Sequence, residues 1–266
     1  MTPQVTTLDN GLRVISEEMS SLETASVGVW VNAGARCEQP EINGISHLLE
    51  HMAFKGTQLR SARAIAEEIE AVGGHLNAYT SREQTAYFAK VLKEDLPLAV
   101  NILADILQNP IFDKDELRRE QTVVIQEIGQ AQDTPDDIVF DYFQDIAFPN
   151  QPLGRPILGT SENVSNFTRD TLATYLSDHY TPNRMVVSAA GNIDHDRLVE
   201  LTNQTFLSTT IGNGDTFEKA RYVGGSVYQP RELEQVHLLL GFNGLAYDDK
   251  DYYALQVFST LFGGGM

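Results

Sequence analysis

Cysteine is almost absent from this sequence: Cys37 is the only one in 266 residues, so no internal disulfide can form. Apolar residues never run long enough to span a bilayer as a helix, so no membrane association is expected. Residues 1–7 have neither the basic region and apolar core of a secretory signal nor the arginines of a transit peptide. These absences predict a cytoplasmic bacterial protein, with a mature organellar form as the open alternative.

Basic residues are also scarce, with 19 Lys and Arg against 37 Asp and Glu and a net charge of −18. A protein that binds a phosphate backbone usually carries a basic face, so nucleic acid is not an expected partner. The simplest interpretation of the charge is a solvated acidic surface. The alternative is an acidic chamber that favours basic peptides.

The most informative stretch that is present is His47-Leu48-Leu49-Glu50-His51. On a helix, positions i, i+3 and i+4 share one face. Two histidines one turn apart can hold a zinc ion, and the glutamate between them can act on a water that the metal activates. The alternative is an ordinary half-buried helix with incidental polar residues. That alternative is costly, because buried imidazoles and a buried carboxylate need partners.

A third metal ligand is expected, because catalytic zinc sites use three protein groups and a water. The best candidates lie in the segment 113–127, where Asp113 and Glu116 have the spacing of a capping box that opens a helix. Glu120 and Glu127 then fall two turns apart on one face of that helix. From spacing alone, a solvated acidic helix explains these carboxylates equally well.

The remaining pattern alternates strands and helices. Strands are expected at 11–17, 24–32, 185–191 and within 76–90, where residues 80–83 form a turn. Helices are expected at 61–72, 95–107, 113–131, 136–147, 168–178 and 194–206, in addition to the motif helix. Together these elements predict an α+β fold with a largely antiparallel sheet flanked by helices.

Several stretches resemble the inverted-zincin peptidases, the family of pitrilysin, insulysin and the mitochondrial processing peptidase. They include the His-x-x-Glu-His motif with Glu127, and residues 8–14, 44–46, 54–57, 77–81, 153–159 and 180–187. The similarity runs over the whole chain and is closest to the bacterial and mitochondrial processing-peptidase branch. It implies the N-terminal half of a clamshell built from two homologous halves, followed by the start of the second half.

The resemblance assigns roles to five residues. It implies one Zn²⁺ per chain, held by His47, His51 and Glu127. It implies that Glu50 is the general base that takes a proton from the attacking water. Glu120 matches a second acidic position of the family, placed in the catalytic site near the metal but outside its ligands. The implied activity is zinc-dependent endopeptidase cleavage of extended peptides or presequences.

Substrate binding is implied at an edge strand, where an extended peptide adds to the sheet through backbone pairing. The residues in question are Asn77, Ala78, Tyr79 and Thr80. Without the resemblance, this segment is an ordinary hairpin. The other four histidines are expected to be structural or surface residues: His75, His179, His195 and His237.

Three parts of the chain are distinguished: a catalytic zinc-binding domain at 1–206, a linker at 207–220, and the start of a second homologous domain without metal ligands at 221–266. The last part is expected to hold strands near 221–229 and 235–243 and a helix at 251–262. The chain is therefore expected to be truncated, a fragment, or a natural half. The alternative function is therefore a non-catalytic or incomplete peptide-binding subunit that needs a complementing chain, and a homodimer or heterodimer with a related subunit is expected.

Overall fold

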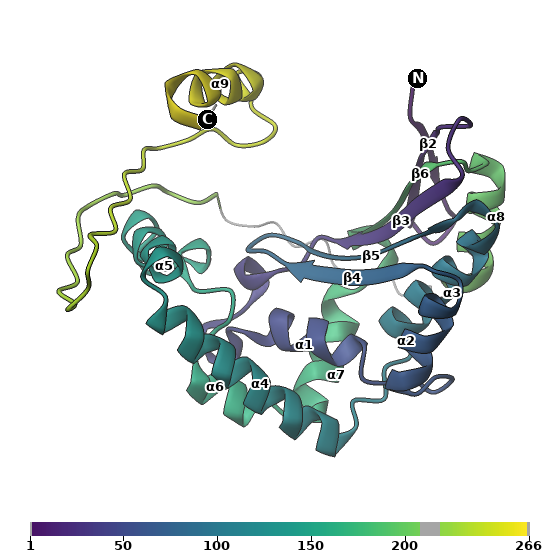
Figure 1. Cartoon of the computed structure of the whole chain (residues 1–266), viewed down its shortest axis with the longest axis horizontal. Coiled ribbons are helices and arrows are strands. Elements are labelled where there is room, and N and C mark those ends of the chain that lie inside the picture. The colour runs from purple at the N-terminus through teal and green to yellow at the C-terminus, as the bar shows by residue number, and fades with distance from the viewer. Residues whose placement is uncertain (1, 208–218, 265–266) are drawn as a thin grey trace.

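The computed structural model describes residues 2–207 and 219–264 (Figure 1). A six-stranded sheet with the order β1-β2-β6-β3-β5-β4 forms its centre. Among the described strands, β2 and β6 pair in parallel and all other neighbours pair antiparallel, which confirms the predicted α+β fold. The strands are β1 (Gln4–Thr7), β2 (Arg13–Glu18), β3 (Thr24–Val31), β4 (His75–Thr80), β5 (Thr85–Leu92) and β6 (Met185–Gly191).

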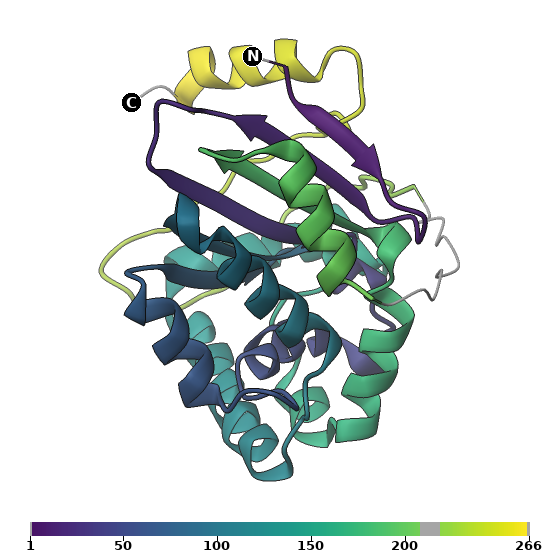
Figure 2. The ribbon, with the colours of Figure 1, turned by 90° about the vertical axis from the view of Figure 1, so that its right-hand side faces the viewer.

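Helices cover one face of the sheet, with α1 and α7 beneath β4 and β5 in the view of Figure 1 and α3 and α8 toward the other end (Figure 2). The helices of the domain are α1 (Ile45–Ala53), α2 (Ala62–Ala71), α3 (Leu96–Gln108), α4 (Lys114–Asp133), α5 (Pro135–Ala147), α6 (Ser161–Asn166), α7 (Arg169–His179) and α8 (His195–Thr205). Helix α9 (Tyr252–Ser259) lies apart from them in the C-terminal segment.

The core lies between the sheet and these helices. In β3, Ala25, Val27 and Val29 alternate with residues of the opposite face and are almost fully buried. Gly28 lies on that opposite face, where a Cβ atom would come within 3 Å of the Trp30 and Phe88 side chains. Strand alternation of period two therefore sets which residues enter the core.

Helix starts agree with the sequence prediction because side-chain caps define them. Asp113 accepts hydrogen bonds from the backbone nitrogens of Asp115 and Glu116 at the start of α4. Ser61 accepts from Ala64 N at the start of α2 in the same way. Strand β1 and helix α6 were not predicted, because both are short and lie in segments that are mostly polar.

Residues 219–264 differ from the prediction. Helix α9 confirms the expected helix, but the strands expected at 221–229 and 235–243 are wrong, because the described chain forms no hydrogen-bonded ladder there. A strand needs a partner for its ladder, and this segment packs instead against α5, where Val223 N donates to Ala147 O. The predicted linker lies almost entirely at 208–218, outside the described residues.

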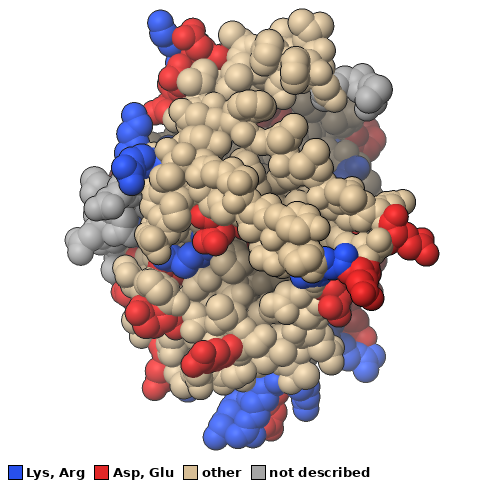
Figure 3. All heavy atoms as spheres, turned by 90° about the vertical axis from the view of Figure 1, so that its left-hand side faces the viewer, with Lys and Arg blue, Asp and Glu red and all other residues tan. Residues whose placement is uncertain are grey.

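The C-terminal segment leaves apolar side chains uncovered. Val236, Leu238, Leu240 and Phe242 alternate along the chain and are 94, 78, 75 and 82% exposed. Figure 3 views this side of the molecule and shows few charged side chains over its centre. Contiguous apolar faces of this kind are uncommon on the surface of monomeric soluble proteins. No helix within residues 2–207 and 219–264 has the length and apolarity needed to cross a bilayer.

Candidate metal centre

Helix α1 carries both motif histidines and is amphipathic. Its apolar side chains Leu48, Leu49 and Met52 are buried against the core. This orientation turns His47 and His51 toward α4, where both remain half-buried. The helical spacing of the motif is therefore realised, with the two imidazole rings 4.7 Å apart between centroids.

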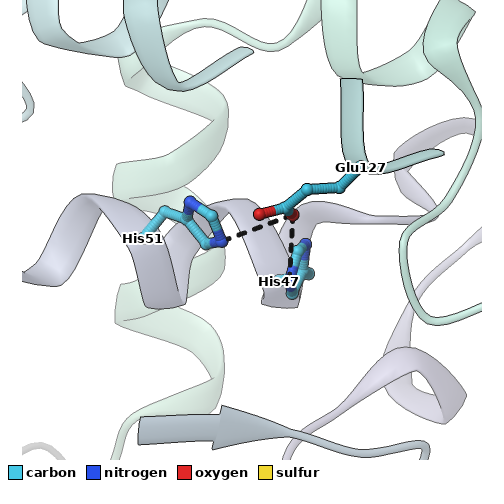
Figure 4. Close-up of side chains that lie close together, drawn as sticks. All are labelled: His47, His51 and Glu127. Carbon is cyan, nitrogen blue, oxygen red and sulfur yellow. Dashed lines mark ion pairs between the residues drawn. The ribbon is translucent and has the colours of Figure 1, made fainter. Parts of the chain in front are cut away.

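Glu127 of α4 reaches across to both histidines (Figure 4). Its Oε2 lies 3.8 Å from His47 Nε2 and 3.7 Å from His51 Nε2. The three ligand atoms lie within 4.8 Å of one another. In the part of the chain that the structure describes, no other group of three His, Cys, Asp or Glu residues converges in this way.

The donor set fits zinc. Ligand atoms about 2.0–2.2 Å from a tetrahedral zinc lie about 3.5 Å apart, close to the observed separations. Burial and the neighbouring His51 lower the pKa of His47 to about 4, so its imidazole is neutral at neutral pH and its nitrogen lone pair is available. The half-exposed carboxylate of Glu127 supplies the anionic ligand.

Glu120 is the second acidic residue that α4 brings to the site, and it is only 6% exposed. Its Oε2 lies 3.0 Å from His51 Nδ1, and its Oε1 lies 2.7 Å from Lys55 Nζ. A carboxylate that accepts from Nδ1–H leaves Nε2 free for a metal and orients the ring. In contrast, His47 Nδ1 is buried and has no hydrogen-bond partner among the described residues. The role of Lys55 was missed from the sequence, because nothing in the local pattern pairs it with Glu120.

We expect Glu120→Gln to weaken zinc affinity by about tenfold, because loss of an outer partner of a ligating histidine typically costs this much. The amide cannot accept from His51 and pair with Lys55 as a carboxylate does. Competition with a chromophoric chelator measures the affinity. Glu116→Gln on the same helix, which removes only a partly exposed pair with Arg119, is the control. An unchanged zinc affinity in Glu120→Gln would show that Glu120 does not contribute to metal binding.

Glu50 lies on the same side of α1 and is half-buried. Burial raises its pKa above the ordinary value, and the charge of Glu127 adds to this effect, while the hydrogen bond from Thr80 and the nearby His51 oppose it. Thr80 Oγ1 donates to Glu50 Oε2 at 2.5 Å. A carboxylate whose affinity for protons is raised beside a metal site is suited to accept a proton from water.

The four residues predicted to bind substrate lie on β4, which ends the sheet among the described strands and contacts α1. Asn77 and Tyr79 are exposed, whereas Ala78 and Thr80 are half-buried on the side of α1. Ala78 N donates to Asn77 Oδ1 at 2.8 Å and not to β5, so this donor faces the free edge. Within residues 2–207 and 219–264, the structure thus places an unpaired strand edge beside the motif helix.

Glu38 has a role that sequence reasoning missed. Its carboxylate is 2% exposed and accepts from Gly44 N at 2.8 Å, Ser46 N at 2.9 Å and Asn43 Nδ2 at 2.8 Å. Two of these donors are backbone nitrogens at the start of α1: that of Gly44, which directly precedes the helix, and that of Ser46, its second residue. Gly44 has no side chain to cap the helix and has a φ of +100°. The carboxylate therefore fixes the start of the helix that carries the metal motif. No local sequence pattern predicts this contact, because a loop separates Glu38 from α1.

Replacement of Glu38 by Gln is expected to lower the free energy of unfolding by about 2 kcal/mol, because an amide group would face donors that now bind a carboxylate. Urea unfolding measures the change. Glu41→Gln, on an exposed side chain of the same loop, should leave the midpoint unchanged. A Glu38→Gln midpoint equal to that of the wild type would show that the loop holds α1 without this carboxylate.

The other histidines that the structure describes lie outside the metal group. His195 bridges Thr6 Oγ1 at 2.8 Å and Ser16 Oγ at 2.7 Å, which ties α8 to β1 and β2. His179 contacts Arg184 and packs against the Tyr175 ring. These contacts agree with the structural roles expected for them.

Comparison with known proteins gives two family matches. Residues 13–161 match the model described as insulinase, peptidase family M16, and residues 166–266 match that of the peptidase M16 inactive domain. A Rickettsia felis protein named as an uncharacterized zinc protease is 43% identical over 98% of this chain and 64% of its own length. The Bos taurus mitochondrial-processing peptidase subunit beta is 42% identical over 99% of this chain and 56% of its own length.

Solved structures agree at the level of the fold. A protease from Helicobacter pylori aligns with a TM-score of 0.77 and 26% identity, over 83% of this chain and 54% of that one. The peptidase M16 inactive domain from Pseudomonas fluorescens gives the same TM-score at 15% identity, a likeness of fold alone. The chain spans 64% and 56% of the length of the two curated relatives described above.

Proposed function

Because the chain belongs to the insulinase family of peptidases, M16, we propose that it is the metal-binding part of a zinc-dependent endopeptidase. One observation carries the proposal: His47, His51 and Glu127 converge from two helices, and Glu50 lies on the same side of α1. We propose one zinc ion per chain with these three residues as its ligands. Zinc at this position would supply Lewis-acid polarisation and a water nucleophile at neutral pH.

The roles of the surrounding residues follow from their contacts. Glu50 would take the proton of the attacking water and pass it to the leaving amine, as a general base and then a general acid. Glu120 would orient His51 and stay out of the proton transfers, because its two oxygens are occupied by His51 and Lys55. The resemblance places Glu120 in the catalytic site, and we propose that its role there is to position His51.

The substrate is proposed to be an extended peptide that pairs with the free edge of β4. Backbone pairing tolerates varied side chains, so a single strand edge suits many sequences. The Asn77 side chain would have to leave Ala78 N–H for a peptide carbonyl to take its place. Presequences are one proposed substrate class, since several relatives are named mitochondrial-processing peptidase subunits, and small peptides are the other. The net charge of −18 favours basic peptides.

A related subunit is the proposed partner, in a homodimer or a heterodimer. The relatives named as subunit beta are longer than this chain, and the exposed apolar residues of 219–264 offer a surface to cover. We propose the division into a zinc-binding domain at 1–206, a linker at 207–220 and the beginning of a second domain at 221–266. The second candidate function, a peptide-binding subunit that is inactive without a complementing chain, rests on the same exposed surface.

The experiment that tests the function measures zinc content after mild purification and cleavage of an unstructured basic peptide by mass spectrometry. We expect close to one zinc per chain and cleavage that a chelator abolishes and added zinc restores. If the protein binds zinc but cleaves the peptide only after a related longer subunit is added, the second candidate is favoured. Less than stoichiometric zinc in the purified protein would contradict both the metal site and the peptidase.

A further inference from the structure

Thr80 occupies a junction between the proposed peptide-binding edge and the proposed base. It is the last residue of β4, half-buried on the side of α1, and its Oγ1 donates to Glu50 Oε2 at 2.5 Å. The exposed residues of the strand, Asn77 and Tyr79, alternate with it and lie on the opposite face. The Thr80 side chain therefore faces the motif helix and turns away from the exposed face of the strand.

We propose that Thr80 is a positioning residue for Glu50 and that its side chain is not a peptide contact. This inference rests on the proposed function. A carboxylate on a flexible side chain has two equivalent oxygens and can rotate. A hydroxyl that holds Oε2 stops this rotation and leaves Oε1 as the oxygen that can exchange a proton with substrate and water.

Strand β5 makes this position rigid. Thr80 lies directly opposite Thr85, which is fully buried and donates from Oγ1 to Ala33 O at 2.9 Å. The end of β4 is thus anchored to the core through its neighbour. The same strand would pair with the peptide backbone and would hold Glu50 through Thr80. Strand β4 would therefore set the distance between the scissile bond and the base.

The test compares Thr80→Val, which keeps the shape and removes the hydroxyl, with Thr80→Ser, which keeps the hydroxyl. We expect Thr80→Val to lower kcat by about tenfold with KM unchanged, since a displaced catalytic group costs rate and not binding. Thr80→Ser should retain most of the wild-type kcat. In a Glu50→Gln background, which is expected to cleave far more slowly than the wild type, adding Thr80→Val should leave the peptide dissociation constant unchanged. Zinc content should stay the same in every variant.

Thr205→Val is the matched control, because the Thr205 hydroxyl bonds only within its own helix α8 in the contacts described, and its loss should change neither kcat nor KM. A raised KM and a weakened peptide affinity in Thr80→Val, with kcat unchanged, would make Thr80 a peptide contact and overturn the inference. Equal loss in Thr80→Ser and Thr80→Val would overturn it too, because the hydroxyl would then be irrelevant.

A second measurement does not depend on catalysis. In urea unfolding of the zinc-free protein, the effects of Thr80→Val and Glu50→Ala should be non-additive if the two side chains are coupled, because each change alone removes the hydrogen bond between them. Additive effects would contradict the inference. Absence of cleavage by the wild type, with non-additive unfolding effects, would instead count against the proposed function alone.

Discussion

Replacement of Glu50 by Gln is expected to lower peptide cleavage by about 10³-fold, within the range that general acid–base catalysis contributes, and to leave zinc binding intact. Glutamine has nearly the same shape, and its amide oxygen can still accept the hydrogen bond from Thr80. It cannot take a proton from water. None of the three proposed metal ligands is altered, so the change isolates proton transfer from metal binding.

The measurement pairs kcat with the zinc content of the same preparation. Glu67→Gln is the control, because Glu67 is exposed on α2 and its ion pair with Arg63 lies on the surface, within that helix. We expect that control to match the wild type in both quantities. Cleavage by Glu50→Gln at more than about a tenth of the wild-type rate would show that another group is the base.

Replacement of Glu127 by Ala is expected to abolish stoichiometric zinc binding, with a loss of affinity above the ~100-fold that removal of an outer partner can cost. Glu127 is the only carboxylate of the proposed ligand set, and its loss leaves two imidazoles. Its side chain is 39% exposed, so truncation should create no cavity in the core. Peptide cleavage should disappear together with the metal.

Chelator competition measures the affinity, and urea unfolding of the zinc-free protein checks that the fold is kept. Gln126→Ala truncates the preceding, exposed side chain of α4 and should bind zinc as the wild type does. Tight zinc binding by Glu127→Ala would contradict the assignment. It would show that another group supplies the third ligand, because Glu120 contacts His51 at Nδ1 and not at the Nε2 that faces Glu127.

Much of the fold follows from local sequence. The start of α4 at Asp113 is a side-chain cap that needs only the next three residues. Strand β3 needs only its alternation of buried and outward residues. The candidate site is also largely local. His47, Glu50 and His51 share one helix, and Glu127 comes from another. For that residue, the resemblance to a family supplied what spacing alone left open.

Contacts between distant segments were not predictable in this way. The Glu38 cap of α1 joins a loop to a helix, and the Lys55–Glu120–His51 chain joins α1 to α4. The prediction of strands in residues 221–243 was wrong for the same reason. Their alternating apolar pattern is present, but pairing depends on a neighbour that the described chain does not bring to them.

By itself the sequence determined the element types, the face of α1 that carries the motif and the chemistry of its donors, because helical and strand periodicities act over a few residues. Tertiary structure decided that Glu127 of α4 reaches both histidines and that Glu120 contacts His51 at Nδ1. It also decided that Thr80 faces Glu50. Those outcomes depend on how α4 and β4 cross α1, and a crossing is set by packing over the whole core, not by the residues that meet there.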